Sequence, residues 1–392
     1  MPRVLRIINR FNLGGPTYNA AYLTKYLGEG YETKLVGGTK DATEDSSEFI
    51  LENLGLEAET LPEMRRSIHP LRDRQAYKKL RELIGDYKPD IVHTHASKPG
   101  ALGRWAAHKV KVPVIVHTFH GHVFHSYFSP QVTAFYKRLE RKLASVSTRI
   151  IAISEIQKQE LAFVHKICPP EKIEVVPLGF DLTRFQDEDG EMRRVFRTVY
   201  HLGPNDVAVA IIGRLVPIKN HTLFLRAFKK ALSETGVRTK AFVVGDGEMR
   251  REAEARCAEL GLKYTDGHDP DADVYFTSWV KKVEFVNAGA DIVALTSKNE
   301  GTPVSLIEAQ AAERAVVSTR TGGIEDVVVP GGSALLSPPD DEDAFAENLL
   351  KLINDAEMRN RFGKAGREFV IEKFHYRRLA GDMTDLYNRL LA

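Results

Sequence analysis

Two basic side chains flank a short turn in the segment Gly213-Arg214-Leu215-Val216-Pro217-Ile218-Lys219. The apolar run at residues 206–213 predicts a strand, and the carboxyl ends of parallel strands are where open α/β sheets bind ligands. Arg214 and Lys219 can therefore reach one crevice and neutralise a diphosphate, the guanidinium in a bidentate manner. An ordinary pair of surface charges is the alternative interpretation.

Two acids surround a Gly-Thr-Pro turn further along the chain, with Glu300 before it and Glu308 after it. The proline fits a helix start, whose free N–H groups can hold phosphate oxygens. The residues concerned are Gly301, Thr302, Pro303 and Val304. Glu300 can accept hydrogen bonds from sugar hydroxyls, and Glu308, over a turn into the helix, from a cis-diol such as ribose. A glutamate near a helix start also simply suits the helix dipole.

A glycine turn, Gly14-Gly15-Pro16, follows the predicted first strand at residues 4–8 and precedes a predicted helix at 17–27. Glycine lets the backbone approach a ligand closely, so a diphosphate fits at this helix start. A tight strand-to-helix turn needs glycine in any case. The spacing is not the Gly-x-Gly-x-x-Gly pattern of dinucleotide-binding domains, which argues against a dehydrogenase.

Histidines are concentrated in one stretch of 33 residues; they are His93, His95, His108, His117, His120, His122 and His125. His120, His122 and His125 have the His-x-His-x-x-His spacing of some binuclear zinc hydrolases, and such imidazoles can share an ion. Those sites usually carry an aspartate just before the last histidine, where this chain has Phe124. We therefore predict no metal site and expect hydrogen-bonded structural histidines.

Composition excludes several classes of protein. The chain has 392 residues, 43% of them hydrophobic and 28% charged, which excludes disorder and fibrous repeats. Its two cysteines exclude a disulfide-built scaffold and fit a reducing compartment. No apolar run reaches the roughly 18 residues that a bilayer span needs, and the first eight residues predict a strand instead of a signal peptide. We therefore predict a cytoplasmic protein.

Charge is distributed unevenly, although the formal net charge is only +2. Residues 1–185 hold 27 Lys and Arg against 20 Asp and Glu, while the remainder holds 28 against 33. The basic excess is concentrated in residues 101–150, where eight basic side chains face one acid, Glu140. This favours an anionic partner such as a nucleotide phosphate, a lipid phosphate or a membrane surface. A solvated helix face is the alternative.

The elements that must position these residues follow a repeated strand–turn–helix rhythm. Strands are predicted at 4–8, 90–93, 113–118 and 149–153, and the rhythm restarts at 206–213, with later strands at 241–244, 291–295, 315–318 and 334–336. Such alternation implies parallel sheets with right-handed crossovers, here two Rossmann-like domains joined near residues 176–181. Two final helices, at 359–373 and 375–391, have no strand between them and are expected to pack outside the alternation.

Taken in order, Gly14-Gly15, Thr118-Phe119-His120, Gly213-Arg214 with Lys219, and Glu300 with Glu308 resemble the motifs of the family 4 retaining glycosyltransferases. Gly245-Asp246-Gly247 and Gly322-Gly323 stand where that family usually has glycines. The resemblance implies an α/β protein of the GT-B fold, with a cleft between two Rossmann-like domains. It implies an acceptor-binding domain at 1–185, a nucleotide-sugar-binding domain at 186–374, and a C-terminal helix at 375–392 that returns to the first domain.

The resemblance also implies a role for each matching residue. Arg214 and Lys219 resemble the pair that holds the donor diphosphate, Glu300 the acid that binds the donor sugar, and Glu308 the acid that binds ribose. His120 resembles the histidine beside the transferred sugar. Gly14 and Gly15 would approach the diphosphate from the other domain.

In terms of activity, the resemblance implies a retaining hexosyltransferase that uses a nucleotide-diphospho-sugar, for which a UDP-sugar is the family's commonest choice. The donor is a substrate, so no cofactor is expected. No metal is expected, because protein cations and a helix N-terminus can stabilise the leaving diphosphate. No nucleic-acid partner is expected either. Asp271-Ala272-Asp273 matches the Asp-x-Asp pattern of a metal-binding motif, but it stands in a polar loop and is expected at the surface.

The acceptor is expected to be a sugar or a lipid-linked saccharide in surface polysaccharide assembly. A helix predicted at 134–149 carries Phe135, Leu139, Leu143 and Val146 on one stripe, flanked by Lys137, Arg138, Arg141 and Lys142. Either the stripe covers the sheet of the first domain, or it is exposed and docks on anionic lipid at the inner face of the membrane. Both hold together if the stripe is buried and only the basic residues face the lipid. Aromatic residues at 124, 127 and 128 can stack on an acceptor sugar or form a packed lid.

Two other functions remain open from the sequence. A nucleotide-sugar 2-epimerase of the same fold would use acids and histidines for elimination and would need no acceptor. A non-catalytic sugar-nucleotide-binding protein would not need the complete set of Arg, Lys and two Glu signatures.

Overall fold

The computed structural model describes residues 1–11, 15–39, 48–65, 67–121 and 129–392. The chain divides into two compact units: unit 1 comprises Met1–Phe180 and Phe374–Ala392, and unit 2 comprises Asp181–Lys373. The division falls five residues before the expected boundary at 185/186, because the 3₁₀ turn Thr183–Phe185 contacts helices of unit 2.

Unit 1 is built on a parallel sheet in which the described strands have the order β3-β2-β1-β4-β5-β6-β7. The strands are β1 (Arg3–Ile7), β2 (Glu32–Gly38), β3 (Ala58–Leu61), β4 (Ile91–His95), β5 (Val114–Phe119), β6 (Arg149–Ala152) and β7 (Ile173–Val175). The central strands β1, β4, β5 and β6 are buried over nearly their whole length, because helices cover both faces of a parallel sheet. The chain order reverses between β1 and β4, so the loops after these two strands diverge there.

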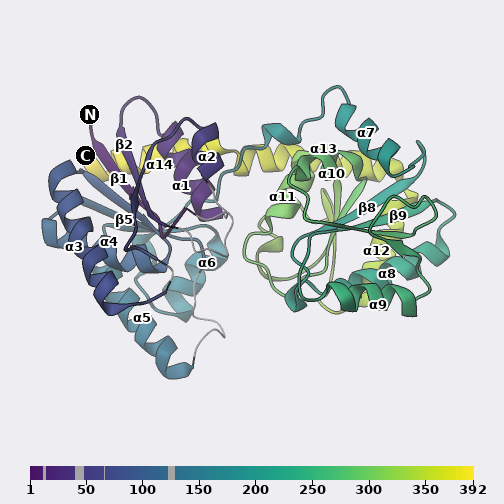
Figure 1. Cartoon of the computed structure of the whole chain (residues 1–392), viewed down its shortest axis with the longest axis horizontal. Coiled ribbons are helices and arrows are strands. Elements are labelled where there is room, and N and C mark those ends of the chain that lie inside the picture. The colour runs from purple at the N-terminus through teal and green to yellow at the C-terminus, as the bar shows by residue number, and fades with distance from the viewer. Residues whose placement is uncertain (12–14, 40–47, 66, 122–128) are drawn as a thin grey trace. The chain divides into compact units, whose positions relative to one another are not determined.

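Helices cover both faces of this sheet; they are α1 (Gly15–Tyr26), α2 (Glu48–Asn53), α3 (Pro70–Tyr87), α4 (Ser97–Val110), α5 (Pro130–Ser145), α6 (Glu155–Gln159) and α14 (Tyr376–Leu391). Helices α1 and α14 lie on one face (Figure 1). There Leu23 of α1 and Leu386 of α14 pack with Val4 and Val116 of the sheet. On the other face, α3 and α4 bury Leu80 and Ala106 against the same strands.

The C-terminal helix α14 is part of unit 1, although it follows unit 2 in the sequence. Phe180 and Tyr376 are joined by a backbone hydrogen bond, and the Arg378 guanidinium donates to the carbonyl oxygens of Pro177 and Leu178 at 2.7 Å. Further along the helix, the Tyr31 hydroxyl donates to Asn388 Oδ1 at 2.7 Å. These bonds and the apolar stripe of α14 attach it to the first sheet.

Unit 2 repeats the architecture with the described strand order β10-β11-β9-β8-β12-β13-β14. The strands are β8 (Val207–Ile212), β9 (Thr239–Val244), β10 (Tyr264–Thr265), β11 (Val274–Ser278), β12 (Ile292–Leu295), β13 (Ala315–Thr319) and β14 (Ala334–Ser337). Strand β8 pairs with both β9 and β12, so the chain order reverses between β8 and β12. In open α/β sheets, such a reversal marks the crevice where ligands bind.

The helices of unit 2 are α7 (Glu191–Val199), α8 (His221–Glu234), α9 (Arg250–Glu259), α10 (Val283–Gly289), α11 (Val304–Ala311), α12 (Glu342–Asn354) and α13 (Ala356–Phe374). Helices α8, α9 and α12 bury Phe228, Cys257 and Leu349 on one face of the sheet. Figure 1 shows α10 and α11 on the opposite face.

The bounds of three helices have local causes. Helix α4 begins at Ser97, since Pro99 is tolerated in a first helical turn. Helix α5 was predicted to end at 149 but ends at Ser145, and the Ser147 hydroxyl donates to the Leu143 carbonyl just past its end. Ser154 caps α6, its hydroxyl accepting the N–H of Gln157 at 3.1 Å.

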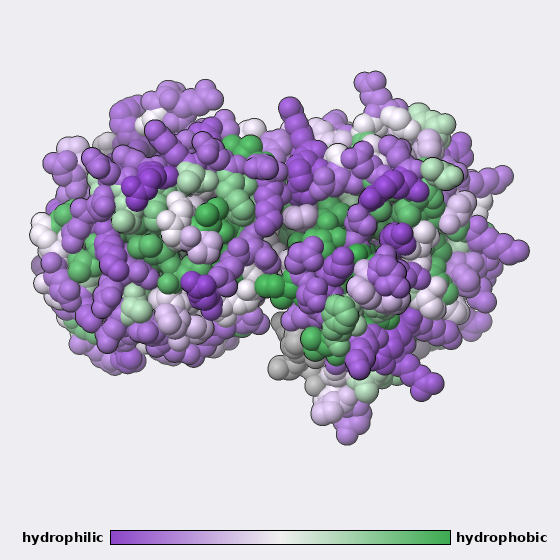
Figure 2. Space-filling view, turned by 180° about the vertical axis from the view of Figure 1, so that it is seen from behind, coloured by the Kyte–Doolittle hydropathy of each residue, from purple (hydrophilic) through white to green (hydrophobic). Residues whose placement is uncertain are grey.

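Hydrophilic residues dominate the face of the molecule seen in Figure 2, with smaller hydrophobic patches between them. Among the helices that the structure describes, none combines the length and the apolar character needed to cross a bilayer.

Candidate active site

The carboxyl end of β8 turns sharply at Gly213, whose N–H donates to the Val244 carbonyl at 2.9 Å. Gly245, with φ of +132°, lies directly beneath this turn, and a Cβ there would come 2.0 Å from the Gly213 carbonyl oxygen. Only glycine fits that contact, which gives a physical reason for the Gly-Asp-Gly segment found in the sequence. The turn leaves Arg214 exposed, and its guanidinium forms no ion pair with a described residue.

Lys219 and Glu300, predicted from two separate motifs, are brought into direct contact. The Lys219 Nζ lies 2.5 Å from Glu300 Oε1, and the Ser297 hydroxyl donates to the same oxygen at 2.5 Å. The two charged side chains are 21% and 12% exposed, so the pair is mostly shielded from water. A cation, a carboxylate and the guanidinium-bearing turn therefore meet at the reversal between β8 and β12.

Threonine side chains fix the loop that carries Glu300. The Thr296 hydroxyl donates to the carbonyl oxygens of Lys219 and Asn220 at 3.0 Å, which ties this loop to the β8 turn. From the neighbouring strand and its following loop, Thr319 and Thr321 donate to the carbonyl oxygens of Ser297 and Lys298. Hydroxyl-to-carbonyl bonds of this kind were not predicted from the sequence.

Gly322 and Gly323 support Glu300 from below. The Gly323 N–H donates to the Glu300 carbonyl oxygen at 2.9 Å. A Cβ on Gly322 would lie 2.0 Å from that oxygen, and a Cβ on Gly323 would lie 1.8 Å from the Gly301 carbonyl oxygen. Any larger residue would push the loop away, so this glycine pair determines where Glu300 stands.

Helix α11 begins directly after this loop, with Pro303 as its N-cap residue and Val304 as its first residue. Gly301 is exposed and has open space around it, and Thr302 is partly buried. The first N–H groups of α11 therefore start at the same edge of the sheet as the Lys219–Glu300 pair. Backbone donors at a helix start are suited to an anionic ligand.

Glu308 lies inside α11 and forms an ion pair with Arg184 of the 3₁₀ turn Thr183–Phe185, at 3.3 Å. Burial raises the pKa of Glu308 to about 7, which Arg184 opposes and Glu284 reinforces. Near neutral pH the carboxyl group is therefore only partly ionised. Arg184 was missed in the sequence, since nothing local marks a partner 124 residues away.

In unit 1, His120 stands immediately after β5 and contacts His95 of β4. His95 Nδ1 and His120 Nε2 are 3.0 Å apart, and their rings stack at 5.3 Å between centroids. Burial lowers the pKa of His120 to about 4, so its imidazole is neutral at neutral pH. A neutral imidazole can donate one hydrogen bond and accept another.

The histidine cluster continues beneath His95 as a buried polar column. The His93 ring lies 4.2 Å from that of His95, and its nitrogens lie 2.6 Å from the Tyr387 hydroxyl and 2.7 Å from the Thr118 hydroxyl. His117 is also buried and hydrogen-bonded, to Thr94 at 2.9 Å. These histidines are hydrogen-bonded structural residues, as expected.

Some sequence candidates fall outside this geometry. Gly14, His122, His125 and the aromatic residues at 124, 127 and 128 lie outside the described residues, while Gly15 is the first residue of α1. Asp271-Ala272-Asp273 precedes β11, at the amino edge of the sheet and away from the Glu300 loop. Asp271 is exposed, and Asp273 accepts the Lys263 N–H, in agreement with the expected surface position.

Known proteins are similar to this chain over most of its length. The family model described as Glycosyl transferases group 1 matches residues 193–369, and the model described as Glycosyltransferase Family 4 matches residues 14–184. A UDP-Gal:alpha-D-GlcNAc-diphosphoundecaprenol alpha-1,3-galactosyltransferase of Escherichia coli is 30% identical over 330 residues, which cover 83% of this chain and 82% of the relative. The chain belongs to glycosyltransferase family 4.

Solved structures show that this glycosyltransferase has the GT-B fold. HepE of Anabaena, crystallised with UDP, superposes with a TM-score of 0.80 at 18% identity, over 99% of this chain and all of the other. WaaG, a glycosyltransferase of lipopolysaccharide biosynthesis, gives 0.67 at 16% identity, over 98% and 99% of the two chains. The capsular polysaccharide glycosyltransferase CapM of Staphylococcus aureus is 26% identical over 84% of each chain. The family, the fold and the enzyme class predicted from the sequence are confirmed.

Proposed function

We propose that this glycosyltransferase moves a hexosyl group from a UDP-sugar to a hydroxyl of a lipid-linked saccharide, with retention of the anomeric configuration. The observation that carries the donor assignment is the Lys219–Glu300 contact beside the exposed Arg214 and the start of α11. Two cationic side chains and backbone N–H donors can bind a diphosphate, and the Glu300 carboxylate can accept hydrogen bonds from sugar hydroxyls. Together these groups match a sugar diphosphate. The UDP held by HepE and the UDP-Gal named for the Escherichia coli relative support the nucleotide.

In this proposal Arg214, Lys219 and the N–H groups at Gly301–Val304 bind the diphosphate. Glu300 accepts hydrogen bonds from the donor sugar, and Glu308 binds the ribose. Because Glu300 already contacts Lys219, one residue pair links the sugar end of the donor to its phosphate end. From unit 1, His120 would bind the transferred sugar, and the Gly14-Gly15 turn would approach the diphosphate.

Retention results if the acceptor hydroxyl attacks from the face that the leaving group departs from. The bond between the anomeric carbon and the diphosphate oxygen breaks, and a bond to the acceptor oxygen forms. The acceptor proton passes to the departing diphosphate, so no carboxylate nucleophile is required. Arg214, Lys219 and the α11 N-terminus stabilise the negative charge that grows on the leaving group, the task that a metal ion performs in other transferases.

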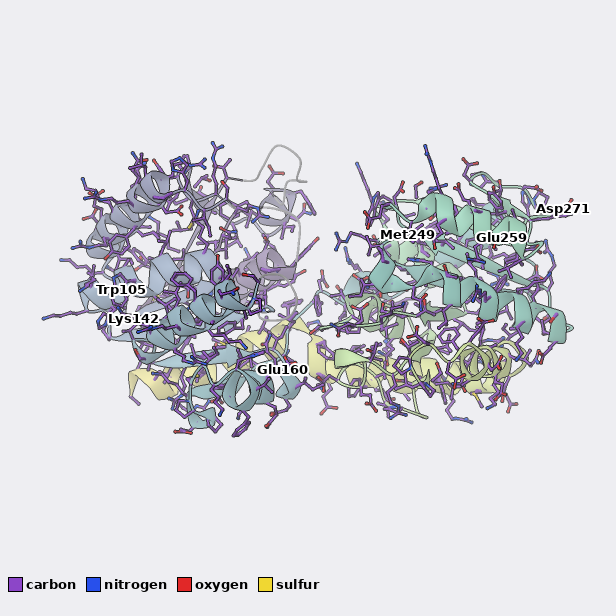
Figure 3. All side chains as sticks on the ribbon, turned by 90° about the horizontal axis from the view of Figure 1, so that it is seen from below. Trp105, Lys142, Glu160, Met249, Glu259 and Asp271 are labelled. Atoms are coloured by element: carbon purple, nitrogen blue, oxygen red, sulfur yellow. The ribbon has the colours of Figure 1, made fainter. Side chains whose placement is uncertain are left out.

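A basic surface on unit 1 supports an acceptor carried by a lipid. The ammonium groups of Lys142 and Lys109 lie 5.0 and 5.5 Å from the ring centre of Trp105, and Figure 3 shows Lys142 beside Trp105. Trp105 and Leu139 line an apolar pocket of about 230 Å³. The diphosphoundecaprenol acceptor named for the relative supports a lipid carrier, and CapM supports a role in polysaccharide assembly.

The predicted stripe on α5 is divided between two environments. Leu143 is buried against the unit, whereas Phe135 is 64% exposed. Arg141 uses its guanidinium internally, donating to the carbonyl oxygens of His165 and Lys166. Lys142 and the exposed Arg138 are therefore the better candidates for contact with lipid phosphate, and we propose weak, peripheral binding at the inner face of the membrane.

Vesicle co-sedimentation tests this contact. The protein should pellet with anionic but not with neutral vesicles, and high salt should release it. Replacing Arg138 and Lys142 by Glu should abolish the binding, while Arg141→Gln, which removes an internally bonded cation, should reduce it less. Equal recovery with both vesicle types would leave these residues as an ordinary solvated face.

The reaction itself is tested by incubation with UDP-sugars, first alone and then with lipid-linked acceptors. Transferred sugar with the donor's anomeric configuration, read by NMR, supports the proposal. Epimerised sugar in the absence of an acceptor would identify a 2-epimerase. Binding without turnover on any acceptor would identify a non-catalytic sugar-nucleotide-binding protein, and inverted product would exclude the retaining mechanism.

A further inference from the structure

A second polar cavity lies at the opposite edge of the sheet of unit 2. It has a volume of about 510 Å³ and opens at the amino ends of β8 and β12, next to the junction of α12 and α13. Three arginines line it, Arg193, Arg314 and Arg359, together with three carboxylates and several amides. The Lys219–Glu300 pair stands at the carboxyl ends of the same two strands, so the two sites do not overlap.

The carboxylates of this cavity are already neutralised by arginines. Asp291 accepts hydrogen bonds from Arg193 at 2.5 Å, from Arg197 at 3.1 Å and from the Ala208 N–H at 2.8 Å, which occupies both oxygens. The other two carboxylates form ion pairs as well, Asp206 with Arg238 and Glu313 with Arg367. None of the three forms an ion pair with Arg314 or Arg359 in the described part of the chain.

Among the residues that the structure describes, Arg314 and Arg359 donate hydrogen bonds to backbone carbonyls alone. Arg314 donates to the carbonyl oxygens of Ala312 at 2.6 Å and Ala290 at 3.0 Å, and Arg359 donates to those of Leu352 and Ile353 at 2.6 and 2.8 Å. Each of these bonds uses Nε or Nη1, and Nη2 of both arginines bonds to no described residue. Two guanidinium edges are therefore left to donate into the cavity.

The local charge supports an anionic occupant. Three arginines and three carboxylates line the cavity; with Arg197, Arg238 and Arg367, which pair with those carboxylates, and the nearby Asp187 and Asp355, the count is six arginines against five carboxylates. Burial, reinforced by the neighbouring Arg193, lowers the pKa of Arg314 to about 10, and Asp291, Glu313 and Asp187 oppose this shift. These acids form no ion pair with the Arg314 guanidinium, so an anion in direct contact with it would offset part of the cost of its burial.

We propose that this cavity binds a small phosphate-type anion, inorganic phosphate or pyrophosphate, through the free Nη2 groups of Arg314 and Arg359. Guanidinium groups bind phosphate oxygens in bidentate pairs, and two of them at one cavity match a polyvalent anion better than chloride. The cavity volume accommodates pyrophosphate as well as phosphate. The site is separate from the proposed donor site, and its existence does not depend on the proposed function.

Calorimetric titration with pyrophosphate, and separately with phosphate, tests the proposal at constant ionic strength maintained with sodium chloride. The full chain is used with Lys219→Ala in the background, so that binding at the proposed donor site is suppressed. We expect saturable binding with a Kd of about 1 mM or below and a rise in Tm with anion concentration. Arg359→Gln should weaken the affinity at least about tenfold, because it removes a charge-assisted contact.

Arg226→Gln is the matched control, since Arg226 is an exposed arginine on α8 paired with Glu342 at 3.7 Å. It should leave the anion affinity unchanged. Arg314→Gln should act like Arg359→Gln, and circular dichroism shows whether this more buried substitution still folds. Equal affinity in the Lys219→Ala protein with and without Arg359→Gln, or no saturable binding of either anion, would overturn the proposal whatever the transferase assays show.

Discussion

Lys219 and Glu300 are 81 residues apart in the sequence, yet the Lys219 ammonium lies 2.5 Å from the Glu300 carboxylate. The contact arises because β8 and β12 are neighbours in the sheet, and the loops that follow these two strands lie at the same carboxyl edge. It joins the two motifs that the sequence singled out most clearly, at the edge of the sheet where we propose that the donor binds.

Replacing Lys219 by Ala should lower kcat/KM for the nucleotide sugar at least about tenfold. One charge-assisted contact to the departing diphosphate is worth about 1.5–3 kcal/mol, and about 1.4 kcal/mol corresponds to a factor of ten. Initial-rate kinetics measure the effect. Lys364→Ala, which removes an exposed lysine on α13, should leave kcat/KM unchanged. Equal values for both variants would remove Lys219 from the diphosphate site.

Gly323→Ala should disable the enzyme without unfolding it. The new methyl group would lie 1.8 Å from the Gly301 carbonyl oxygen, so the Glu300 loop must shift. We expect at least about a tenfold loss of kcat/KM, because misplacing a substrate-binding group by about 1 Å can cost a factor of a hundred. In Gly236→Ala the added Cβ meets open space, which makes this variant the control. Unchanged kinetics in Gly323→Ala would show that the loop tolerates displacement.

Tyr387→Phe should destabilise unit 1 by about 1–3 kcal/mol. The substitution removes the hydroxyl that lies 2.6 Å from His93 Nδ1 and leaves a buried nitrogen without its partner. Urea unfolding followed by tyrosine and tryptophan fluorescence measures the change. Tyr264→Phe, at an exposed position, supplies the comparison. A Tyr387→Phe protein as stable as the Tyr264→Phe protein would mean that the α14 contact contributes little.

Glu308 should make folding stability depend on pH between about 4.5 and 7. Its pKa is about 7 in the folded protein and about 4.5 when the chain is unfolded. The folded state therefore holds a proton that the unfolded state has lost, and stability falls as pH rises, by up to about 1.4 kcal/mol per unit. Unfolding at a series of pH values should show this slope reduced in Glu308→Gln. A slope identical in both proteins would contradict the raised pKa.

Transfer should continue in EDTA, because Arg214, Lys219 and the α11 N-terminus take the place of a metal ion at the diphosphate. Activity before and after chelation, with Mg²⁺ and Zn²⁺ added back separately, measures this. A loss of activity that zinc restores would indicate a zinc site with His120, His122 and His125 as ligands. Loss restored by magnesium would instead make the donor site metal-dependent.

The sequence by itself indicated the central strands of both sheets and the chemistry of the motifs, whereas it did not predict β2, β3, β7, β10 and β11. Apolar runs followed by Gly-rich turns marked the central strands, because a strand buried on both faces is mostly apolar. Arg214, Lys219 and Glu300 were found because each stands in a loop between a predicted strand end and a helix start, and Glu308 because it follows a turn into the next helix. The buried histidines could be named, although not their partners.

Only the tertiary structure decided which of these residues meet. Arg184 pairs with Glu308, Gly323 supports Glu300, and Tyr387 reaches His93 across 294 residues. None of these contacts has a sequence spacing that could predict it, since strand order and helix docking place the partners. The same holds for the stripe on α5: periodicity shows which residues share a face, but whether Leu143 is buried and Phe135 exposed depends on where the neighbouring helices end.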